Sequence, residues 1–126
     1  MSKIKIDRAD RFFSLYVRER DDWRCKRCGN TGESLQCSHY FGRANEAVRF
    51  EPLNADTLCY ACHVMWGSTD REGYRNFKLN QLGDNMFKVL ILRANGYKKK
   101  DRKMDAIKWR LAYQDLCKQK NIKPRV

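Results

Sequence analysis

Two histidines and an asparagine form the first chemically suggestive pattern in the chain: His39, Asn54 and His63. These are the only histidines, with fourteen residues between His39 and Asn54 and eight between Asn54 and His63. Hydrolysis of a phosphodiester needs a neutral imidazole that accepts a proton from water. It also needs a divalent ion, held by another side chain, that neutralises charge on the phosphate. Asn54 would hydrogen-bond the backbone and fix the orientation of His39, so the three residues together predict a nuclease-type site.

Four cysteines frame this pattern as two CxxC pairs that are thirty residues apart: Cys25, Cys28, Cys59 and Cys62. Each pair can place two thiolates on one tight turn, and four thiolates form a tetrahedral zinc site with Zn–S distances of about 2.3 Å. Because four sulfurs fill the coordination sphere of Zn²⁺, we expect a structural site rather than a catalytic one. Four unligated thiols are the weaker alternative.

The other two cysteines and one tryptophan near the site are expected to be structural. Cys37 lies in a predicted hairpin, where a buried thiol is the favoured interpretation and an approach to the metal site is the alternative. Cys117 is expected to be a small core residue. Trp66 is expected in the core rather than stacked on a nucleic-acid base.

Length and charge restrict the class of protein. A chain of 126 residues with 42% hydrophobic residues fits a single domain with a modest core, to which a metal ion adds stability. The net charge is +12, and residues 98–126 alone carry +8, so nucleic acid is the expected partner, with a basic tail that only aids solubility as the alternative. No apolar run is long enough for a membrane span, and residues 1–7 lack a secretory signal, which favours the cytosol.

Residues 7–22 predict an amphipathic helix with Asp7 as its N-cap. Its apolar stripe comprises Phe12, Phe13, Tyr16 and Val17. Its other face is basic and comprises Arg8, Arg11, Arg18 and Arg20.

A small β-hairpin is expected next, from one strand at 35–41 and a second strand at 48–50. A helix should then cover the second CxxC pair and stop near Gly67. His39 would lie on the hairpin and His63 at the start of this helix. The two imidazoles could therefore face each other across a small cleft.

Three further helices are predicted at 70–82, 84–95 and 104–119, and glycines stop the first two. In the last helix, four residues are expected on one apolar side: Met104, Ile107, Leu111 and Cys117. The elements indicate one α+β domain over residues 1–126. It comprises an N-terminal helix (7–22), a zinc core (23–67) and a basic helical extension (68–126).

In its motifs the chain resembles the HNH, or ββα-metal, nucleases, and more closely the lambdoid phage NinG (Rap) recombination endonucleases. The matching segments are 13–21 (FSLYVRERD), 25–29 (CKRCG), 35–43 (LQCSHYFGR), 49–54 (RFEPLN) and 58–63 (LCYACH). The resemblance covers about residues 10–83 and is specific in its spacing. The chain also resembles phage endonuclease VII, because the residue after the final cysteine, here His63, would face the catalytic metal.

The resemblance implies a treble-clef-like zinc frame with a ββα-metal core, and a phage DNA endonuclease that cuts branched recombination intermediates in the host cell. It implies His39 as general base, His63 as ligand of a catalytic Mg²⁺ or Mn²⁺ ion, and Asn54 as support. Ser38, however, stands where many HNH enzymes have an Asp ligand, and His63 where NinG-type sequences tend to have Asn. Water and phosphate oxygens would then complete the coordination of the ion.

Basic residues near the site are the expected DNA contacts. Arg43 and Arg49 follow His39 by four and ten residues and could clamp the scissile phosphate, with a solvated charged loop as an equal alternative. Five residues before the last helix are expected to hold the DNA backbone without reading sequence: Lys98, Lys99, Lys100, Arg102 and Lys103. A solvated charge run is the alternative for this group.

The favoured function is a metal-dependent, structure-specific DNA endonuclease, because a small domain has little surface for reading a long sequence. The alternatives are a sequence-specific or nicking HNH endonuclease of the restriction or homing type, an RNA-directed nuclease, and a non-catalytic zinc-stapled DNA-binding module. A symmetric homodimer formed through the C-terminal helices is a further expectation.

Overall fold

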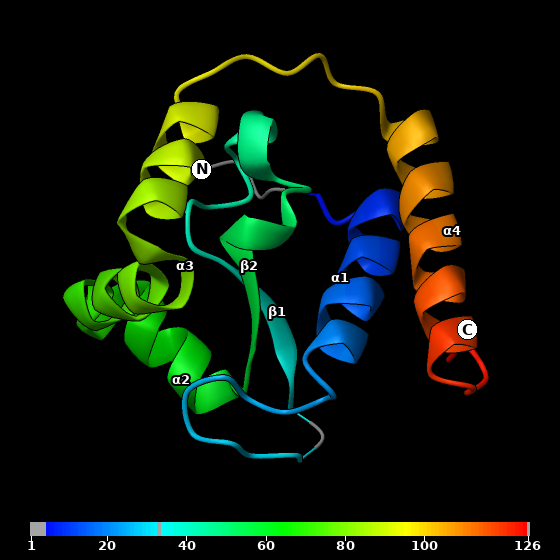
Figure 1. The fold of residues 1–126 in the computed structure, drawn as a ribbon, viewed down its shortest axis with the longest axis horizontal. Coiled ribbons are helices and arrows are strands. Elements are labelled where there is room, and N and C mark those ends of the chain that lie inside the picture. Colours follow the sequence, from blue (N-terminus) through cyan, green and yellow to red (C-terminus); the bar gives the residue numbers. More distant parts are fainter. Residues whose placement is uncertain (1–4, 33, 126) are drawn as a thin grey trace.

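The computed structural model describes residues 5–32 and 34–125 and has an α+β architecture. In chain order the elements are helix α1 (Arg8–Arg20), strand β1 (Gln36–His39), 3₁₀ helices η1 (Glu46–Val48) and η2 (Pro52–Asn54), strand β2 (Ala55–Leu58), helix α2 (Tyr60–Val64), π-helix η3 (Met65–Thr69), and helices α3 (Arg71–Ala94) and α4 (Arg102–Gln119). The strands pair antiparallel, with His39 opposite Ala55. In Figure 1 this pair lies in the centre, with α1 and α4 on one side and α2 and α3 on the other. Within the described residues, no helix is both long and apolar enough to cross a bilayer.

The first hydrophobic core lies between α1, α4 and β1. α1 begins at a reciprocal cap, in which the Asp10 amide donates to the Asp7 carboxylate at 3.0 Å and the Asp7 amide donates to Asp10 at 2.9 Å. Phe13 of α1 meets Trp109 of α4 edge to face, with 4.8 Å between ring centroids. This core also contains the two cysteines outside the CxxC pairs, Cys37 and Cys117. The expected N-terminal helix and the core positions of both cysteines are therefore confirmed.

The second hydrophobic core joins α3 to the hairpin and to the cysteine-bearing turns. Tyr74 of α3 stacks on Trp66 at 4.8 Å and packs edge-on against Tyr40 at 5.1 Å between ring centroids. Trp66 is therefore a core residue, as expected. Because a two-stranded hairpin is only marginally stable by itself, the two cores must supply most of its stability.

The second strand is not at residues 48–50, where alternation predicted it. This stretch lies at the end of η1 and beyond it, and the partner of β1 is β2. All four residues of β2 are buried, including Asp56 and Thr57, so the strand has no alternation of polar and apolar residues. Phe50, which suggested a strand, instead packs edge-on against Phe13 at 5.7 Å.

α3 bends sharply at Gly83, whose φ of 80° and ψ of 166° break the helical path. This conformation is nearly exclusive to glycine, so the two helices predicted on either side of Gly83 are confirmed as two segments of α3. The second segment contacts the loop between the strands. There, Arg93 donates to Glu51 at 2.9 Å, and the Asn45 amide group donates to the Ala94 carbonyl at 2.9 Å.

The buried face of α4 differs from the predicted one. Met104, Ile107 and Leu111 are exposed, with relative accessibilities of 59%, 44% and 53%. The buried residues are Asp105, Trp109, Tyr113 and Cys117. Both sets have helical spacing, and spacing alone does not choose between them. The aromatic rings of the second set bury more apolar area, which explains why that face packs on α1.

A buried ion pair ties α3 to β2. Lys78 Nζ donates to Asp56 Oδ2 at 2.9 Å, and both side chains are at most 1% exposed. Gln81 donates to the other carboxylate oxygen at 2.9 Å, and the Tyr74 hydroxyl lies 3.3 Å from Oδ2. Burial lowers the pKa of Lys78, and the charge of Asp56 opposes this shift. Removing either Lys78 or Asp56 would therefore leave the other residue buried without a counter-charge.

Replacing Lys78 with Met should lower the free energy of unfolding by about 3–5 kcal/mol, because the Asp56 carboxylate would stay buried without its counter-charge. Urea unfolding followed by circular dichroism measures this loss. Lys88→Met, at an exposed position of the same helix, is the matched control and should change the free energy by less than about 0.5 kcal/mol. Similar losses in the two variants would contradict a structural role for the ion pair.

Candidate functional site

Four cysteine thiols meet between the turn after α1 and the start of α2. The Sγ atoms of Cys25, Cys28, Cys59 and Cys62 all lie within 4.8 Å of one another. A tetrahedral zinc site with Zn–S bonds of about 2.3 Å requires about 3.8 Å between sulfurs. The sulfurs of Cys28 and Cys59 are 3.8 Å apart. The cysteine quartet therefore has the geometry to hold a structural Zn²⁺ ion.

The surroundings of the quartet favour ionisation at some sulfurs and oppose it at others. Burial opposes ionisation of Cys25, but backbone amides, first that of Cys28, lower its pKa to about 7. Burial raises the pKa of Cys62 to about 12, although Arg27, whose Nη1 lies 3.4 Å from the Cys62 sulfur, opposes this shift. Four adjacent thiolates repel one another, so a divalent ion is needed for all four to ionise together. The donor set therefore fits zinc.

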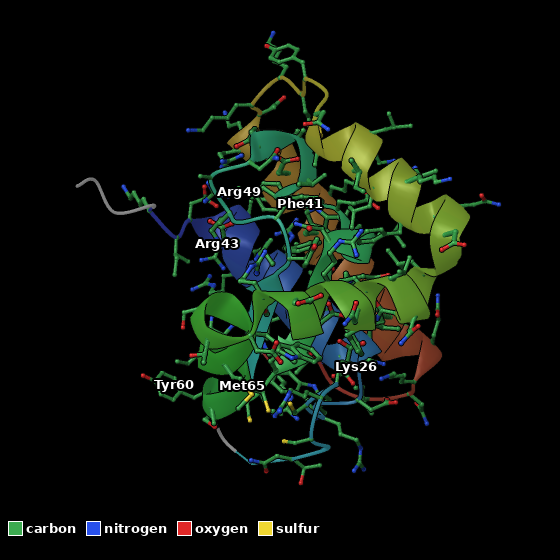
Figure 2. All side chains as sticks on the ribbon, turned by 90° about the vertical axis from the view of Figure 1, so that its left-hand side faces the viewer. Lys26, Phe41, Arg43, Arg49, Tyr60 and Met65 are labelled. Atoms are coloured by element: carbon green, nitrogen blue, oxygen red, sulfur yellow. The ribbon has the colours of Figure 1, made fainter. Side chains whose placement is uncertain are left out.

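Both histidines line one cleft beside the quartet, with a volume of about 750 Å³. His39 is the last residue of β1, and His63 lies in α2. Arg43 lines the same cleft, and its charge influences the pKa of both imidazoles. Figure 2 shows Arg43 next to α1, on the same side of the molecule as Tyr60 of α2. The fold therefore brings together the two histidines that the sequence places in separate elements.

The His39 imidazole is held by the loop between the strands. Its Nε2 lies 2.8 Å from the Arg49 carbonyl oxygen, and because a carbonyl only accepts, Nε2 must carry the proton. Burial, followed by the charge of Arg43, lowers the pKa of His39 to about 4. The ring is therefore neutral at pH 7, and Nδ1 is the nitrogen with a free lone pair. A neutral imidazole in this tautomer can accept a proton from water.

His63 is half-buried, and its Nδ1 is shielded from solvent without a hydrogen-bond partner among the described residues. Burial lowers its pKa, and the charge of Arg43 adds to the shift. A neutral imidazole with an unsatisfied nitrogen is a suitable ligand for a divalent ion. No carboxylate is among the described residues that line the cleft. The donor set therefore fits such an ion only if water and phosphate oxygens supply the remaining ligands.

Asn54 closes the loop between β1 and β2. Its side chain is fully buried, its Oδ1 accepts from the Phe41 amide at 2.8 Å, and its Nδ2 donates to the Phe41 and Val48 carbonyls at 2.9 and 3.1 Å. The same loop carries Arg49, whose carbonyl holds His39. Asn54 can therefore orient His39 through the loop rather than by direct contact.

The two arginines predicted to clamp a phosphate have different environments. Arg49 is buried, and its Nε and Nη2 donate to the two oxygens of Asp10 at 2.9 and 2.5 Å. Since this bidentate pair occupies the guanidinium, the phosphate contact predicted for Arg49 disagrees with the structure. Arg43 lies on the cleft wall, with a 25% exposed side chain 3.6 Å from Asp10. Arg43 is therefore the one of the pair that is positioned to meet a phosphate.

Some of the basic residues at 98–103 lie next to carboxylates, and the others are exposed. Lys98 lies 3.5 Å from an aspartate of α4, and Arg102, in the first turn of α4, lies 2.5 Å from Glu46 and 2.7 Å from Asp7. Arg102 thus connects α4 to η1 and to the cap of α1, and DNA would have to displace these contacts. The exposed members of the group are Lys99, Lys100 and Lys103.

Several residues of the site carry no motif in the sequence. Arg71 and Tyr74 of α3 line the cleft opposite β1, where the Tyr74 hydroxyl lies 3.1 Å from the Ser38 hydroxyl oxygen. Burial raises the pKa of Tyr74 well above its usual value, so this hydroxyl keeps its proton. Asp10 binds Arg49, but its position in the first turn of α1 predicts only a helix-capping role.

The fold and the quartet define a small α+β protein with a zinc-type cysteine cluster next to a two-histidine cleft. A family model described as Bacteriophage Lambda NinG protein matches residues 2–122. Because the match covers nearly the whole chain, the chain belongs to the NinG family. Membership in this phage family points to a role related to phage recombination. No curated protein and no solved structure matches the chain.

Removing the metal from the quartet should unfold the cysteine-bearing core, because three of the four cysteines are buried in it. A chelator should reduce the helical circular dichroism signal, and added Zn²⁺ should restore it. Cys25→Ala should prevent zinc binding, whereas Cys37→Ala, outside the quartet, should retain one ion per chain by metal analysis. Full helical signal after complete metal removal would rule out a structural role for the ion.

The free energy of unfolding should fall between pH 7 and pH 5, in part because of His39. Its pKa of about 4 in the folded chain lies below the usual 6.5. The contribution of His39 to the free energy of unfolding is therefore complete above pH 6.5 and is lost as the pH falls toward 4. His39→Gln should remove about 2 kcal/mol of the loss between pH 7 and pH 5. Urea unfolding of both proteins at each pH measures the difference, and parallel profiles would contradict the expectation.

Proposed function

We propose that the protein is a metal-dependent DNA endonuclease with an HNH-type, or ββα-metal, site. The observation that carries the proposal is one cleft that contains both histidines, with the His39 ring oriented by the Arg49 carbonyl and kept neutral by burial and by the charge of Arg43. The succession β1, β2 and α2, with one histidine on the first strand and the other on the helix, supports it. A net charge of +12 suits a DNA substrate.

In this proposal His39 is the general base. Its Nδ1 takes a proton from the water whose oxygen attacks phosphorus, while Nε2 keeps its hydrogen bond to the Arg49 carbonyl. The bond between phosphorus and the 3′ oxygen breaks, which leaves a 5′-phosphate, and the departing 3′ oxygen takes a proton from a second water to become a hydroxyl. Arg43 binds the non-bridging phosphate oxygens from the cleft wall. A divalent ion such as Mg²⁺ or Mn²⁺, held by His63, supplies charge neutralisation on the phosphate and the leaving oxygen when bound.

Branched recombination intermediates are the proposed substrates. Membership in the NinG family supports this choice, because it points to phage recombination. A domain of 126 residues also has little surface with which to read a long sequence. A symmetric dimer would present two such clefts to opposite strands of a four-way junction.

His39→Ala should reduce nicking of supercoiled plasmid and cutting of a four-way junction by about 100-fold or more in Mg²⁺ or Mn²⁺, with DNA binding retained. His63→Ala should raise the ion concentration needed for half-maximal cutting. His63→Asn is the matched control and should retain more activity, because an amide oxygen still binds a divalent ion. Rates are measured by gel electrophoresis of end-labelled DNA.

Each rival function gives a different result in these assays. Unchanged cutting by His39→Ala would remove His39 from its assigned role. DNA binding by the unmodified protein without any nicking would favour a non-catalytic zinc-stapled module. Linear, nicked, flap and junction DNA, together with RNA, separate a structure-specific enzyme from sequence-specific and RNA-directed ones.

A further inference from the structure

One face of α1 carries a polar stripe that runs along most of the helix. Its members follow at spacings of three, three and four residues, so they lie on the same face: Arg8, Arg11, Ser14 and Arg18. The apolar side of the helix is buried in the first core. The first two arginines are exposed, and each guanidinium lies 5.7 Å from the ring of Phe12. We call these four residues the α1 stripe.

The α1 stripe lines a hollow that adjoins the histidine cleft. This hollow has a volume of about 460 Å³, and all four residues of the stripe are in its wall. Ser14, Arg18 and Arg43 line both the hollow and the cleft. The two depressions are therefore adjacent and share part of their walls, and Arg43, which Figure 2 shows beside α1, belongs to both walls.

The path along the stripe is positively charged although Asp7 and Asp10 also line it. Each of these acids is neutralised by an arginine from elsewhere in the fold. Arg49 donates to Asp10 at 2.9 and 2.5 Å, and Arg102 lies 2.7 Å from Asp7. In residues 5–32 and 34–125, by contrast, the first two arginines of the stripe have no carboxylate within 4.0 Å. Their charges are therefore available to an external anion.

We propose that the α1 stripe binds the phosphate backbone of the DNA strand whose scissile phosphate lies beside Arg43. The stripe spans about 15 Å of helix, which corresponds to the axial rise of about four nucleotides of one strand. Guanidinium groups bind phosphate oxygens in a bidentate manner, and the Ser14 hydroxyl can donate to one more. This inference rests on the proposed function, because it takes the cleft as the place of the scissile phosphate.

The stripe fits this role better than the connector at 98–101. No residue of the connector lines either the hollow or the cleft. In Figure 1 the connector crosses the top of the molecule between α3 and α4. Of its three lysines, Lys98 already faces an aspartate at 3.5 Å. A strand that leaves the cleft therefore meets the stripe first.

The test measures binding of the full-length, zinc-loaded protein to a fluorescent four-way junction by anisotropy, at several salt concentrations and without Mg²⁺ or Mn²⁺. Arg8→Gln/Arg11→Gln should weaken binding about 10- to 50-fold at 0.1 M salt and lower the slope of log K against log salt by about 2. Arg8→Lys/Arg11→Lys keeps both charges and should stay within about five-fold of the unmodified protein. Lys88→Gln/Lys118→Gln removes two exposed charges outside the hollow and should cost less than about three-fold.

The outcomes separate this inference from the proposed function, because the binding assay involves no cutting. A protein that binds DNA through the stripe but never nicks it would refute the nuclease and leave the stripe in place. Unchanged affinity of Arg8→Gln/Arg11→Gln would overturn the inference that the α1 stripe binds DNA. An equal loss of affinity in Lys88→Gln/Lys118→Gln, or in Lys99→Gln/Lys100→Gln, would overturn it as well. Matching circular dichroism spectra exclude misfolding as the cause, and Arg11→Glu, a single charge reversal, should independently weaken binding by more than ten-fold.

Discussion

Two antiparallel strands of four residues have too few hydrogen bonds and too little apolar surface to be stable alone in water. The positions of both histidines depend on this pair, because His39 is the last residue of β1 and His63 lies in α2, the helix that follows β2. The pair is held at one end by the cysteine quartet, where the Lys26 amide also donates to the Thr57 carbonyl at 2.8 Å. α1 and α4 cover one side, and α3 covers the other (Figure 1). The position of the cleft thus follows from the support of a very small sheet.

Two buried ion pairs determine how these supports meet the hairpin. Asp56 on β2 is bound by Lys78 of α3, and Asp10 of α1 is bound by Arg49 of the loop. Buried pairs of this kind add little net stability, but removing one partner leaves an uncompensated charge in the interior. Each pair therefore connects one helix to the strands or to the loop between them: Lys78 connects α3 to β2, and Arg49 connects the loop to α1. The second pair also fixes the backbone whose carbonyl holds the His39 ring.

Features that follow local rules could be predicted from the sequence, and features that depend on distant partners could not. The CxxC pairs, the Asp7 cap and the break at Gly83 each depend on a few neighbouring residues. The burial of Arg49 depends on Asp10, which is 39 residues away. β2 is buried throughout and so lacks the alternation by which a half-exposed strand is detected. The two histidines were expected to share a cleft. The Arg49 carbonyl that holds His39 could not be predicted, because it is a backbone group that no side-chain pattern indicates.

The bend at Gly83 has a consequence for the loop between the strands. No atom within 4 Å would obstruct a side chain at this position, so the requirement for glycine comes from the backbone dihedral angles alone. Because the helix turns there, its outer half returns along the loop and contacts it through Arg93 and Ala94. The loop is thereby enclosed between this half and α1. A straight helix would leave the loop without its outer wall, so a single residue that lacks a Cβ atom determines whether the segment whose Arg49 carbonyl holds His39 is covered on both sides.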